Sequence, residues 1–504
     1  MKKAMKKLMA ALLAVAMVCA MAIPAFADGS SSTSTAPVTT LYKITAPATT
    51  HIYEIYQIFT GDYDASNASM LANIKWGKNG TGTAGEAVDQ TVLNALSAVA
   101  SYTSDSDKLD VIENYVKLNT TPVATVTNSN FVEVVGGYYL IKDQDGSVPS
   151  SETYTTYIVS VVGNVTITPK SNEVPKFTKK LKDTNDTTGV ITGWQDSADY
   201  DIGDKIPFRL QGTVSKDFDS YKTYYYAFHD VEEKGLTFDS SSVKVFVGDE
   251  VTGTKIDASN YTVVTSPTDG CTFEIVFDDL KKVTGVTANS IITVTYESTL
   301  NTDAVLGAQG NVNTAKLEYS NNPRGNGTGT TPWDNVIVFT YKVVVNKIDQ
   351  AGQPLEGAEF TLTKKLKDGT EVDMPMNIDT SNKALFTLSG LDDGEYTLTE
   401  TVTPAHYNTI SPITFTVNAD HTITWESDPR DTVLTSLSGN TASGEITFTP
   451  NKTDGTLTTD VINNIGTTLP GTGGIGTTIF YVIGGGLMVA AAILLITKKR
   501  MENR

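Results

Sequence analysis

Short stretches of alternating apolar and polar residues make up most of this chain, and polar turns separate them. Alternation with a period of two puts one set of side chains on one face of a strand, so each stretch predicts a β-strand with one buried face. The predicted strands are residues 51–59, 131–142, 154–162, 165–169, 206–210, 223–228, 243–247, 261–264, 273–277, 291–296 and 314–319. Strands of this length and spacing favour β-sandwiches.

Residues 85–118 depart from this pattern. Their apolar side chains recur every three or four positions, first at Val88, Val92, Leu96 and Val99, and then at Leu109, Ile112 and Val116. This spacing indicates helices with one apolar face. We therefore expect a helical insertion in the first β-rich domain.

Two apolar runs lie near the ends of the chain. Residues 8–22 follow four lysines and precede Ala25-Phe-Ala27, which is the pattern of a signal peptide cleaved before Asp28. Residues 479–496 are long enough to cross a membrane, and the basic Lys498-Lys-Arg500 that follows favours a cytoplasmic C-terminus. The chain between them is predicted to be exported.

These signals divide the chain into five parts. We expect a signal peptide (1–27), an N-terminal domain (28–172), a middle β-sandwich (173–341), a third β-rich domain (342–466) and a C-terminal segment that contains the membrane helix (467–504). The sequence places the boundary between the second and third domains only to within several residues, because residues 335–348 also fit one strand that runs through both. The Gly- and Asn-rich residues 321–331 are predicted to be a flexible connection.

Composition narrows the class of protein. The net charge is −19, and both predicted removable ends are basic, so the remaining chain is still more acidic, which argues against nucleic acid as a partner. Of the two cysteines, Cys19 lies in the signal peptide, and Cys271 alone cannot form an internal disulfide. Any covalent reinforcement must use other chemistry.

Motifs for enzymes and metals were not found. The four histidines, at positions 51, 229, 406 and 421, are scattered, and there is no HExxH or paired CxxC to predict a zinc site. There is no GxSxG and no Gly-rich phosphate loop. We therefore expect no cofactor, no metal and no enzyme that acts on other molecules.

A lysine, an acid and an amide are predicted to face the core of the middle domain. Strand alternation puts Lys179, Asp230 and Asn313 on the same faces as their apolar neighbours. Buried polar groups cost free energy unless they satisfy one another, so the three are expected to meet.

The third domain repeats the arrangement with Lys347, Glu400 and Asn463, although Val344 and Ile348 make the other face of the first strand nearly as apolar. In both domains the lysine and the amide are expected on the first and last strands.

The residue types suggest a reaction. Burial lowers the pKa of a lysine and raises that of a carboxyl group. A neutral amine can then attack the asparagine carboxamide while the acid moves protons to the departing ammonia, which leaves a Lys–Asn isopeptide bond. Spacing alone equally allows a buried salt bridge or ordinary surface lysines.

The C-terminal stretch carries a first resemblance. Leu469-Pro-Gly-Thr-Gly473, the apolar run and the basic tail together resemble the sorting signal of Gram-positive surface proteins. That resemblance implies that a sortase binds Leu469, Pro470, Gly471, Thr472 and Gly473, cleaves after Thr472 and passes the acyl group to an amine. The alternative is a plain membrane anchor with a chance pentapeptide.

A second resemblance covers nearly the whole chain. Residues 194–204, 226–238 and 313–323 resemble the middle domain of isopeptide-forming fimbrial proteins, and 345–349, 354–362 and 396–404 look like a collagen-adhesin B-type module. The family's Pro-x-Gly-Tyr ending is Pro404-Ala-His-Tyr407 here. The resemblance implies a mainly β chain of tandem immunoglobulin-like sandwiches, with bonds Lys179–Asn313 promoted by Asp230 and Lys347–Asn463 promoted by Glu400. Lys180 and Asn464 are the alternative registers.

A third resemblance concerns Thr168-Pro-Lys-Ser171, which stands where polymerised pilins carry a Tyr-Pro-Lys-Asn-like motif. It implies that Lys170 accepts the acyl group of the next subunit, although the Tyr and the Asn are both replaced. The alternative is an exposed lysine in an interdomain loop.

Together these features predict the shaft subunit of a sortase-assembled pilus, anchored to the cell wall on the surface of a Gram-positive bacterium. The partners implied are pilin-specific and housekeeping sortases, other copies of the chain, minor pilins, peptidoglycan and host surface ligands. The alternative is an anchored adhesin or minor pilin that does not polymerise.

Overall fold

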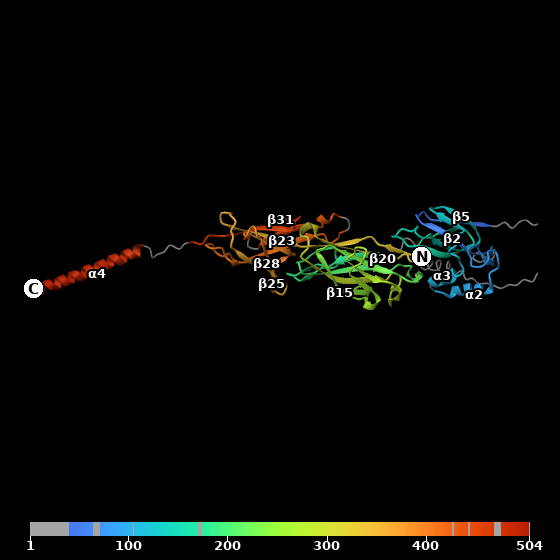
Figure 1. Ribbon diagram of the computed structural model, residues 1–504, viewed down its shortest axis with the longest axis horizontal. Coiled ribbons are helices and arrows are strands. Elements are labelled where there is room, and N and C mark those ends of the chain that lie inside the picture. Colours follow the sequence, from blue (N-terminus) through green and yellow to red (C-terminus); the bar gives the residue numbers. More distant parts are fainter. Residues whose placement is uncertain are drawn as a thin grey trace, which may run out of the picture.

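The computed structural model describes residues 40–63, 71–103, 105–169, 174–425, 428–441, 444–467 and 475–502. Figure 1 shows an elongated molecule in which three β-rich modules follow one another along the long axis. We call residues 40–169 the first module, 174–339 the middle module and 341–467 the third module. Helix α4 (Ile475–Glu502) lies beyond the third module at one end of the molecule.

The first module combines two sheets with the expected helical insertion. One sheet has the order β5-β1-β8 and the other β3-β2-β6-β7, with β4 also paired to β2. The strands are β1 (Leu41–Thr45), β2 (Ile52–Tyr63), β3 (Leu71–Trp76), β4 (Ala124–Thr127), β5 (Phe131–Val135), β6 (Gly137–Asp143), β7 (Thr156–Val161) and β8 (Val165–Thr166). Helices α2 (Gln90–Ala98) and α3 (Asp105–Glu113) form the insertion, and Leu96 packs with Tyr56 and Trp76 in a core of their own.

The middle module is a sandwich of two sheets. Sheet M1 has the order β16-β15-β19-β13-β9, and sheet M2 has the order β12-β22-β20-β14-β18-β17, with β21 also paired to β20. Sheet M1 contains β9 (Phe177–Leu181), β13 (Lys205–Thr213), β15 (Leu236–Val247), β16 (Thr254–Lys255) and β19 (Ile291–Leu300). Sheet M2 contains β12 (Ser197–Asp199), β14 (Tyr226–Glu232), β17 (Thr262–Val264), β18 (Phe273–Phe277), β20 (Asn311–Ser320), β21 (Thr328–Thr330) and β22 (Asp334–Phe339). Between the sheets, Phe238 stacks on Phe273 with ring centroids 3.6 Å apart.

The third module is a second sandwich. Sheet T1 has the order β26-β27-β23-β32-β31, and sheet T2 has the order β25-β24-β28-β29-β30. Sheet T1 contains β23 (Tyr341–Asp349), β26 (Asn377–Ile378), β27 (Leu385–Leu391), β31 (Thr449–Asn451) and β32 (Thr456–Asn463). Sheet T2 contains β24 (Glu359–Lys365), β25 (Glu371–Met374), β28 (Gly394–Val402), β29 (Ile413–His421) and β30 (Leu434–Thr441). Strands β23 and β32 are adjacent and parallel.

The join between the middle and third modules is a single residue. Strand β22 ends at Phe339, strand β23 begins at Tyr341, and only Thr340 lies between them. Phe339 packs in the same hydrophobic cluster as the core of the third module. The interpretation of 335–348 as one strand is therefore wrong in detail, because two strands in different sheets meet at Thr340.

The prediction that residues 321–331 are a flexible connection is also wrong. This segment contains β21 and docks against the first module. The Tyr154 amide donates to the Asn321 carbonyl at 2.7 Å, and the Thr330 amide donates to the Ser150 carbonyl at 2.9 Å. Arg324 forms ion pairs with Asp110 and Glu113 at helix α3.

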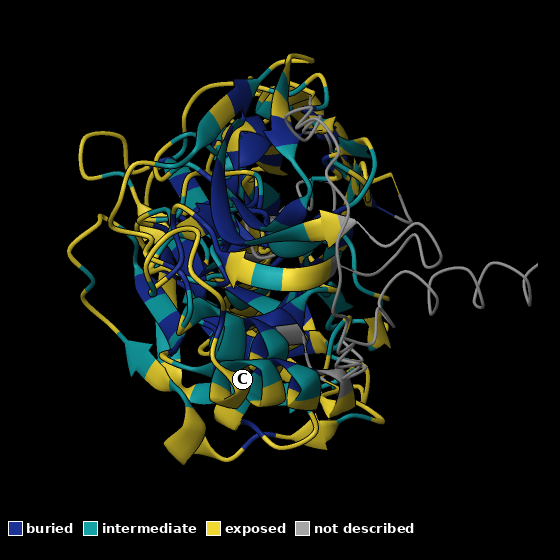
Figure 2. Cartoon of the chain, turned by 90° about the vertical axis from the view of Figure 1, so that its right-hand side faces the viewer, coloured by how far each residue is buried: buried dark blue, intermediate teal, exposed yellow. Residues whose placement is uncertain are grey.

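Buried residues lie in the interior of the β-rich modules. Figure 2 looks along the long axis and shows buried residues gathered in the interior of the modules, with exposed residues in the turns around them. Within the described residues, one helix segment, Ile479–Glu502, is long and apolar enough to cross a membrane, and it packs against nothing else in the chain. It matches the membrane helix predicted for the C-terminal segment. The predicted signal peptide lies outside the described residues.

Candidate functional site: two buried sets of lysine, acid and asparagine

The middle module brings Lys179, Asp230 and Asn313 together in its core, where all three are fully buried. Lys179 lies on β9 of sheet M1, whereas Asp230 and Asn313 lie on the adjacent strands β14 and β20 of sheet M2. In the β14–β20 ladder Asp230 is opposite Ala315, two residues from Asn313. The acid and the amide are therefore diagonal neighbours on one face, and the lysine reaches them from the facing sheet.

The hydroxyl of Tyr296 connects the three groups. The Lys179 Nζ donates to Asp230 Oδ2 at 2.6 Å and to the Tyr296 hydroxyl at 2.7 Å. The Tyr296 hydroxyl donates to Asp230 Oδ2 at 2.8 Å and accepts from Asn313 Nδ2 at 2.9 Å. Among the described residues, Asp230 Oδ1 and Asn313 Oδ1 are buried without a hydrogen-bond partner. The carboxamide oxygen and one carboxyl oxygen are thus unsatisfied in the middle of the core.

Burial favours the uncharged forms of this pair. Desolvation lowers the pKa of Lys179 below its ordinary value, against the opposing attraction of Asp230. Desolvation likewise raises the pKa of Asp230. Glu232, which accepts from Asn313 Nδ2 at 3.3 Å, has its pKa raised to about 8 by burial and by Asp230. Moving the Lys179 proton to Asp230 removes two charges from an apolar core, so the site favours a neutral amine beside a protonated acid.

The third module builds a related site from neighbouring strands. Lys347 on β23 and Asn463 on β32 are fully buried, and the parallel register pairs Lys347 with Val461 and Asp349 with Asn463. Lys347 and Asn463 therefore lie diagonally on one face of sheet T1. Glu400 reaches them from β28 of the facing sheet T2 and is 6% exposed.

In this second set the acid contacts the amide rather than the lysine. Asn463 Nδ2 donates to Glu400 Oε1 at 2.9 Å and to Glu400 Oε2 at 3.1 Å. The Lys347 Nζ donates to the Val461 carbonyl at 3.0 Å. Burial lowers the pKa of Lys347 to about 8, against the opposing attraction of Glu400. A minority of this amine, roughly a tenth to a fifth, is therefore neutral at pH 7–7.4, far more than for an ordinary lysine.

The alternative registers are not buried in the same way. Lys180 is partly exposed and forms an ion pair with Asp196, and Asn464 is exposed. The expectation that the lysine and the amide occupy the first and last strands fits β23 and β32 of the third module. It is wrong for the middle module, because Asn313 lies on β20 and the module continues through β21 and β22.

Sequence reasoning missed Tyr296 and Glu232. Tyr296 follows Ile292 and Val294 on the core-facing side of β19, so its position marks it only as one more aromatic core residue. Its role depends on the contact between sheets M1 and M2, which strand alternation does not specify. Glu232 is two residues after Asp230 on the same face, and that spacing was the available signal.

Two other predicted sites lie outside the described residues: Lys170, and the stretch of Leu469, Pro470, Gly471, Thr472 and Gly473. The described chain ends at Pro169 before Lys170 and begins again at Val174, between the first and middle modules. Their roles therefore stay predictions from the sequence.

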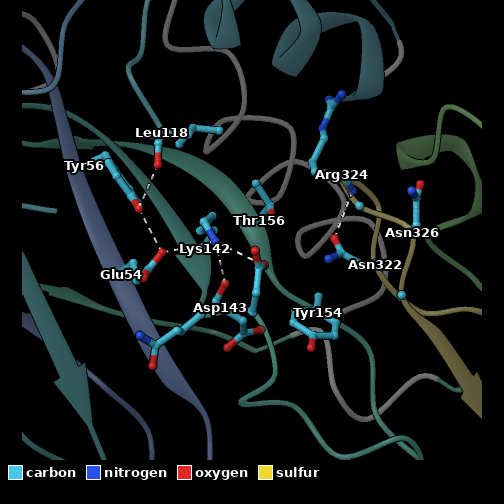
Figure 3. A pocket seen from close by; sticks show the side chains of 14 residues that line it. Glu54, Tyr56, Leu118, Lys142, Asp143, Tyr154, Thr156, Asn322, Arg324 and Asn326 are labelled. Atoms are coloured by element: carbon cyan, nitrogen blue, oxygen red, sulfur yellow. Dashed lines mark hydrogen bonds and ion pairs between the residues drawn. The ribbon is translucent and has the colours of Figure 1, made fainter. Parts of the chain in front are cut away.

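A polar pocket of about 660 Å³ lies where the first module meets residues 322–327. Figure 3 shows Lys142 and Glu54 pointing toward one another on its wall, and Arg324 extending away toward a helix. The Lys142 Nζ lies 3.1 Å from Glu54 Oε2, and the Tyr56 hydroxyl donates to the same oxygen at 2.9 Å. These three side chains are thus paired with one another, and the residues that line the pocket come from both the first and the middle module.

Comparisons with known proteins agree with this architecture. Residues 202–323 match the family model described as Gram-positive pilin backbone subunit 2, Cna-B-like domain. Residues 341–429 match the SpaA prealbumin-like fold domain. The trypsin-resistant surface T6 protein of Streptococcus pyogenes serotype M6 is 25% identical over 398 residues, which cover 65% of this chain and 69% of that protein.

Solved structures of similar shape include two backbone pilins. The T6 backbone pilin of serotype M6 Streptococcus pyogenes superposes with a TM-score of 0.49 and 16% identity, covering 85% of this chain and 99% of that one. The full-length major pilin SpaD from Corynebacterium diphtheriae gives a TM-score of 0.46 and 17% identity, covering 85% and 98%. The family models confirm the predicted mainly β fold with tandem sandwiches of the collagen-adhesin type. Residues 202–323 are therefore a domain of the kind found in Gram-positive pilin backbone subunits, followed at 341–429 by a prealbumin-like domain, in a chain similar to a streptococcal surface protein.

Proposed function

We propose that this chain is the repeating shaft subunit of a sortase-polymerised pilus, and that two autocatalytic Lys–Asn bonds lock its middle and third modules. The match of residues 202–323 to a pilin backbone domain carries the first part of the proposal. The pilin backbone domain and the similarity to a streptococcal surface protein support a structural role on the surface of a Gram-positive cell. The chemistry proposed is a single reaction within each module.

In the middle module the neutral amine of Lys179 attacks Cγ of Asn313. The Nζ–Cγ bond forms, the Cγ–Nδ2 bond breaks, and the departing NH2 group takes up one proton, which comes from the lysine amine, and leaves as ammonia. Protonated Asp230 donates a hydrogen bond to the developing oxyanion and then moves the lysine proton to the leaving group. Tyr296, within hydrogen-bond distance of all three groups, holds them in register.

In the third module Lys347 attacks Asn463 in the same way. Both oxygens of Glu400 already contact Nδ2, the atom that must leave. Glu400 is thus positioned to deliver protons to the departing ammonia. Each reaction converts a buried amine and a buried carboxamide into one neutral amide and releases ammonia, which removes the cost of burying the amine, while the acid remains.

The sequence signals at the two ends of the chain support a route of export and assembly. The signal peptide would be removed before Asp28, and a sortase would cleave between Thr472 and Gly473. The acyl group of Thr472 would pass to Lys170 of another copy and finally, through a housekeeping sortase, to peptidoglycan. Minor pilins and host surface ligands are further proposed partners of the fibre.

The Lys170→Arg substitution tests polymerisation. Arginine keeps the positive charge but is not deprotonated at relevant pH, so it cannot accept an acyl group. We expect cell-wall extracts of the variant to lose the ladder of detergent-resistant multimers and to keep the wall-anchored monomer. Lys176→Arg, which changes an exposed lysine just beyond the same junction, should keep the ladder.

Peptide mapping distinguishes the outcomes. A branched peptide joining Thr472 to the Lys170 side chain supports the proposal. A complete ladder in Lys170→Arg contradicts the assignment of Lys170. Wall-anchored monomer alone in the unsubstituted strain contradicts the shaft and favours an anchored adhesin.

A further inference from the structure

Four side chains with metal-binding atoms meet on the outer face of sheet M2, away from the buried sets. They are His229 on β14, Glu274 on β18, and Asp269 and Cys271 in the turn before β18. The His229 Nδ1 lies 3.0 Å from Asp269 Oδ2, 3.0 Å from Glu274 Oε1 and 3.8 Å from Cys271 Sγ. The Cys271 Sγ lies 3.1 Å from Asp269 Oδ2. One nitrogen, one sulfur and two oxygens thus converge on one point.

The backbone fixes these four positions. His229 and Glu274 are directly opposite in the β14–β18 ladder, so their side chains share one face. In the turn, the Cys271 amide donates to Asp269 Oδ1 at 3.0 Å, which leaves Oδ2 of the same carboxylate to face His229. The turn is tied to β14 because the Thr272 amide donates to the Asp230 carbonyl at 2.7 Å. The ligand atoms are therefore held by a sheet and a tight turn.

Glu318 orients the imidazole from the other side. Glu318 lies on the neighbouring strand β20, and its Oε2 is 3.0 Å from the His229 Nε2. In metal sites the ring nitrogen that does not bind the ion commonly donates its N–H to a carboxylate, which fixes the tautomer. In a zinc-bound form, a proton kept on Nε2 would leave the lone pair of Nδ1 for the ion.

We propose that His229, Asp269, Cys271 and Glu274 bind one zinc ion. Zinc accepts this mixture of imidazole, thiolate and carboxylate ligands, whereas calcium and magnesium take oxygen. Tetrahedral zinc with bonds of about 2.0–2.3 Å places its ligand atoms roughly 3.3–3.8 Å apart. The four separations given above, 3.0–3.8 Å, are close to these, and all four ligand atoms lie within 4.8 Å of one another. Cys271 is partly exposed, which gives the ion a path of entry.

The nearest lysine on β20 does not occupy the place of a cation in this cluster. Lys316 is opposite His229 on β20, but its ammonium lies over the Trp333 ring, 4.7 Å from the centroid. The acidic group of Asp186, Asp201, Asp204 and Asp392 differs, because the Lys364 ammonium already lies among three of its carboxylates. Among the groups of potential metal ligands in the described part of the chain, only the His229 cluster includes a sulfur atom.

This proposal departs from the expectation of no metal, which rested on the absence of known zinc motifs in the sequence. The ligands come from 229 and from 269–274, which are about 40 residues apart in sequence and meet only through the β14–β18 pairing. No spacing rule for paired cysteines or histidines detects such a set. The inference is independent of the isopeptide bonds and of polymerisation.

Cobalt and zinc titrations of the mature chain, residues 28–472, test the site. We expect one zinc ion per chain after chelator treatment under reducing conditions. The cobalt-substituted chain should show a thiolate-to-cobalt charge-transfer absorption, which requires Cys271 as a ligand. Cys271→Ser should abolish that absorption and weaken zinc binding at least about tenfold, and Glu318→Gln should weaken it about 10–100-fold. Glu297→Gln, on the outer face of sheet M1, is the matched control and should bind zinc normally.

Three results would overturn the proposal: no zinc bound at micromolar concentration, a cobalt complex without the charge-transfer band, or equal zinc affinity in Cys271→Ser. Far-UV circular dichroism and thermal melting report whether the variants fold. If Cys271→Ser misfolds, the cobalt spectrum of the unsubstituted chain still decides the question.

Discussion

At the residue scale, the two lysines are placed differently for the isopeptide reaction that we propose. Lys179 contacts its acid directly, whereas Lys347 contacts a backbone carbonyl and its acid contacts the asparagine. Burial is the main cause of the lowered pKa in both cases. In both modules burial in the apolar core favours the neutral amine, and in the third module the acid already contacts the leaving nitrogen.

Mass measurement tests both bonds at once. The mature chain should be lighter than its sequence mass by two ammonia molecules. Asp230→Ala should restore one of them and Glu400→Ala the other, because each acid serves one set. In the chain-entropy account, losing a bond that closes a loop of more than 100 residues lowers the free energy of unfolding by about 4–5 kcal/mol.

Lys180→Arg is the matched control for this experiment. It changes the lysine of the alternative register, which pairs with Asp196 at the surface of the core, so both ammonia losses should remain. An unmodified mass in the folded, unsubstituted chain would refute both bonds.

The pKa of Lys347 predicts how an unlinked third module responds to pH. Asn463→Ala keeps the buried amine but cannot form the bond. The folded pKa of about 8 lies below the ordinary value of 10.5, so the unfolded chain binds more protons between these values. The stability of this variant should rise as pH increases from about 8 to about 10.5, by roughly 2–3 kcal/mol.

Comparison with Lys347→Met/Asn463→Ala isolates this effect. Other titrating groups are common to both proteins, so the difference in denaturant-derived stability belongs to Lys347. The expected difference between the two proteins changes with pH above 8 and is constant below it. A difference that is constant from pH 6 to 11 would contradict the lowered pKa.

At the element scale, the sequence shows which face of a strand is buried more reliably than it shows which strands pair. Alternation correctly placed Lys179 and Lys347 inward, because a strand has only two faces and apolar neighbours mark the buried one. It did not indicate that Lys179 reaches Asn313 across the sandwich, or that β23 and β32 are parallel. Those relations depend on which strands pair, which is decided by contacts between residues more than 100 positions apart.

The segment 321–331 shows the same limit. Its Gly and Asn content predicted flexibility because local composition was the only signal. Docking on the first module decides its structure instead, through Arg324 and through backbone hydrogen bonds to Ser150 and Tyr154. One charged side chain and a few backbone hydrogen bonds thus hold this segment against the first module.

Removing that side chain should loosen the junction between the first and middle modules. Arg324 is largely buried, pairs with Asp110 and Glu113, and donates to the Ser106 carbonyl at 2.9 Å. We expect Arg324→Ala to destabilise the docked segment by roughly 2–3 kcal/mol, because charge-assisted hydrogen bonds are lost. Amide hydrogen exchange should accelerate in residues 321–331 and at helix α3, while the core of the third module is unchanged.

Lys222→Ala provides the control, since Lys222 contacts the same Asp110 at 3.1 Å from a more exposed position. An exposed ion pair contributes at most about 1 kcal/mol, so exchange in 321–331 should change little. Equal acceleration in the two variants would contradict the role given to Arg324.

At the scale of the whole molecule, the middle and third modules form a nearly continuous unit. Only Thr340 separates their sheets, and Arg430 of the third module binds Glu233 of the middle module through two contacts of 2.9 and 3.0 Å. Lys364 of the third module is surrounded by Asp392 of its own module and by Asp186 and Asp201 of the middle one. Together with the docking of the first module, these contacts favour the extended arrangement in Figure 1.

The position of Asn313 before the end of its module has a mechanical consequence. In a fibre linked from Thr472 to Lys170, a pulling force enters each subunit at the start of the middle module and leaves after the third, so the first module carries no load. In the third module the force crosses from Lys347 to Asn463 and bypasses residues 348–462. In the middle module the bond bypasses 180–312, but residues 314–339 remain in series with the load.

Those residues include a hairpin pulled at its open end. Asn313 is opposite Val336 in the antiparallel β20–β22 ladder, so force applied at Asn313 and Phe339 breaks its hydrogen bonds one pair at a time. We expect single-molecule pulling to extend each linked subunit by roughly 70 Å, the length of about 22 residues, while the third module stays closed. Asp230→Ala should extend by the length of the whole middle module instead, and extension of the third module before the middle one would contradict the assigned load path. Each subunit would then act as a short spring of fixed travel, which lets the fibre absorb a pull without breaking a covalent bond.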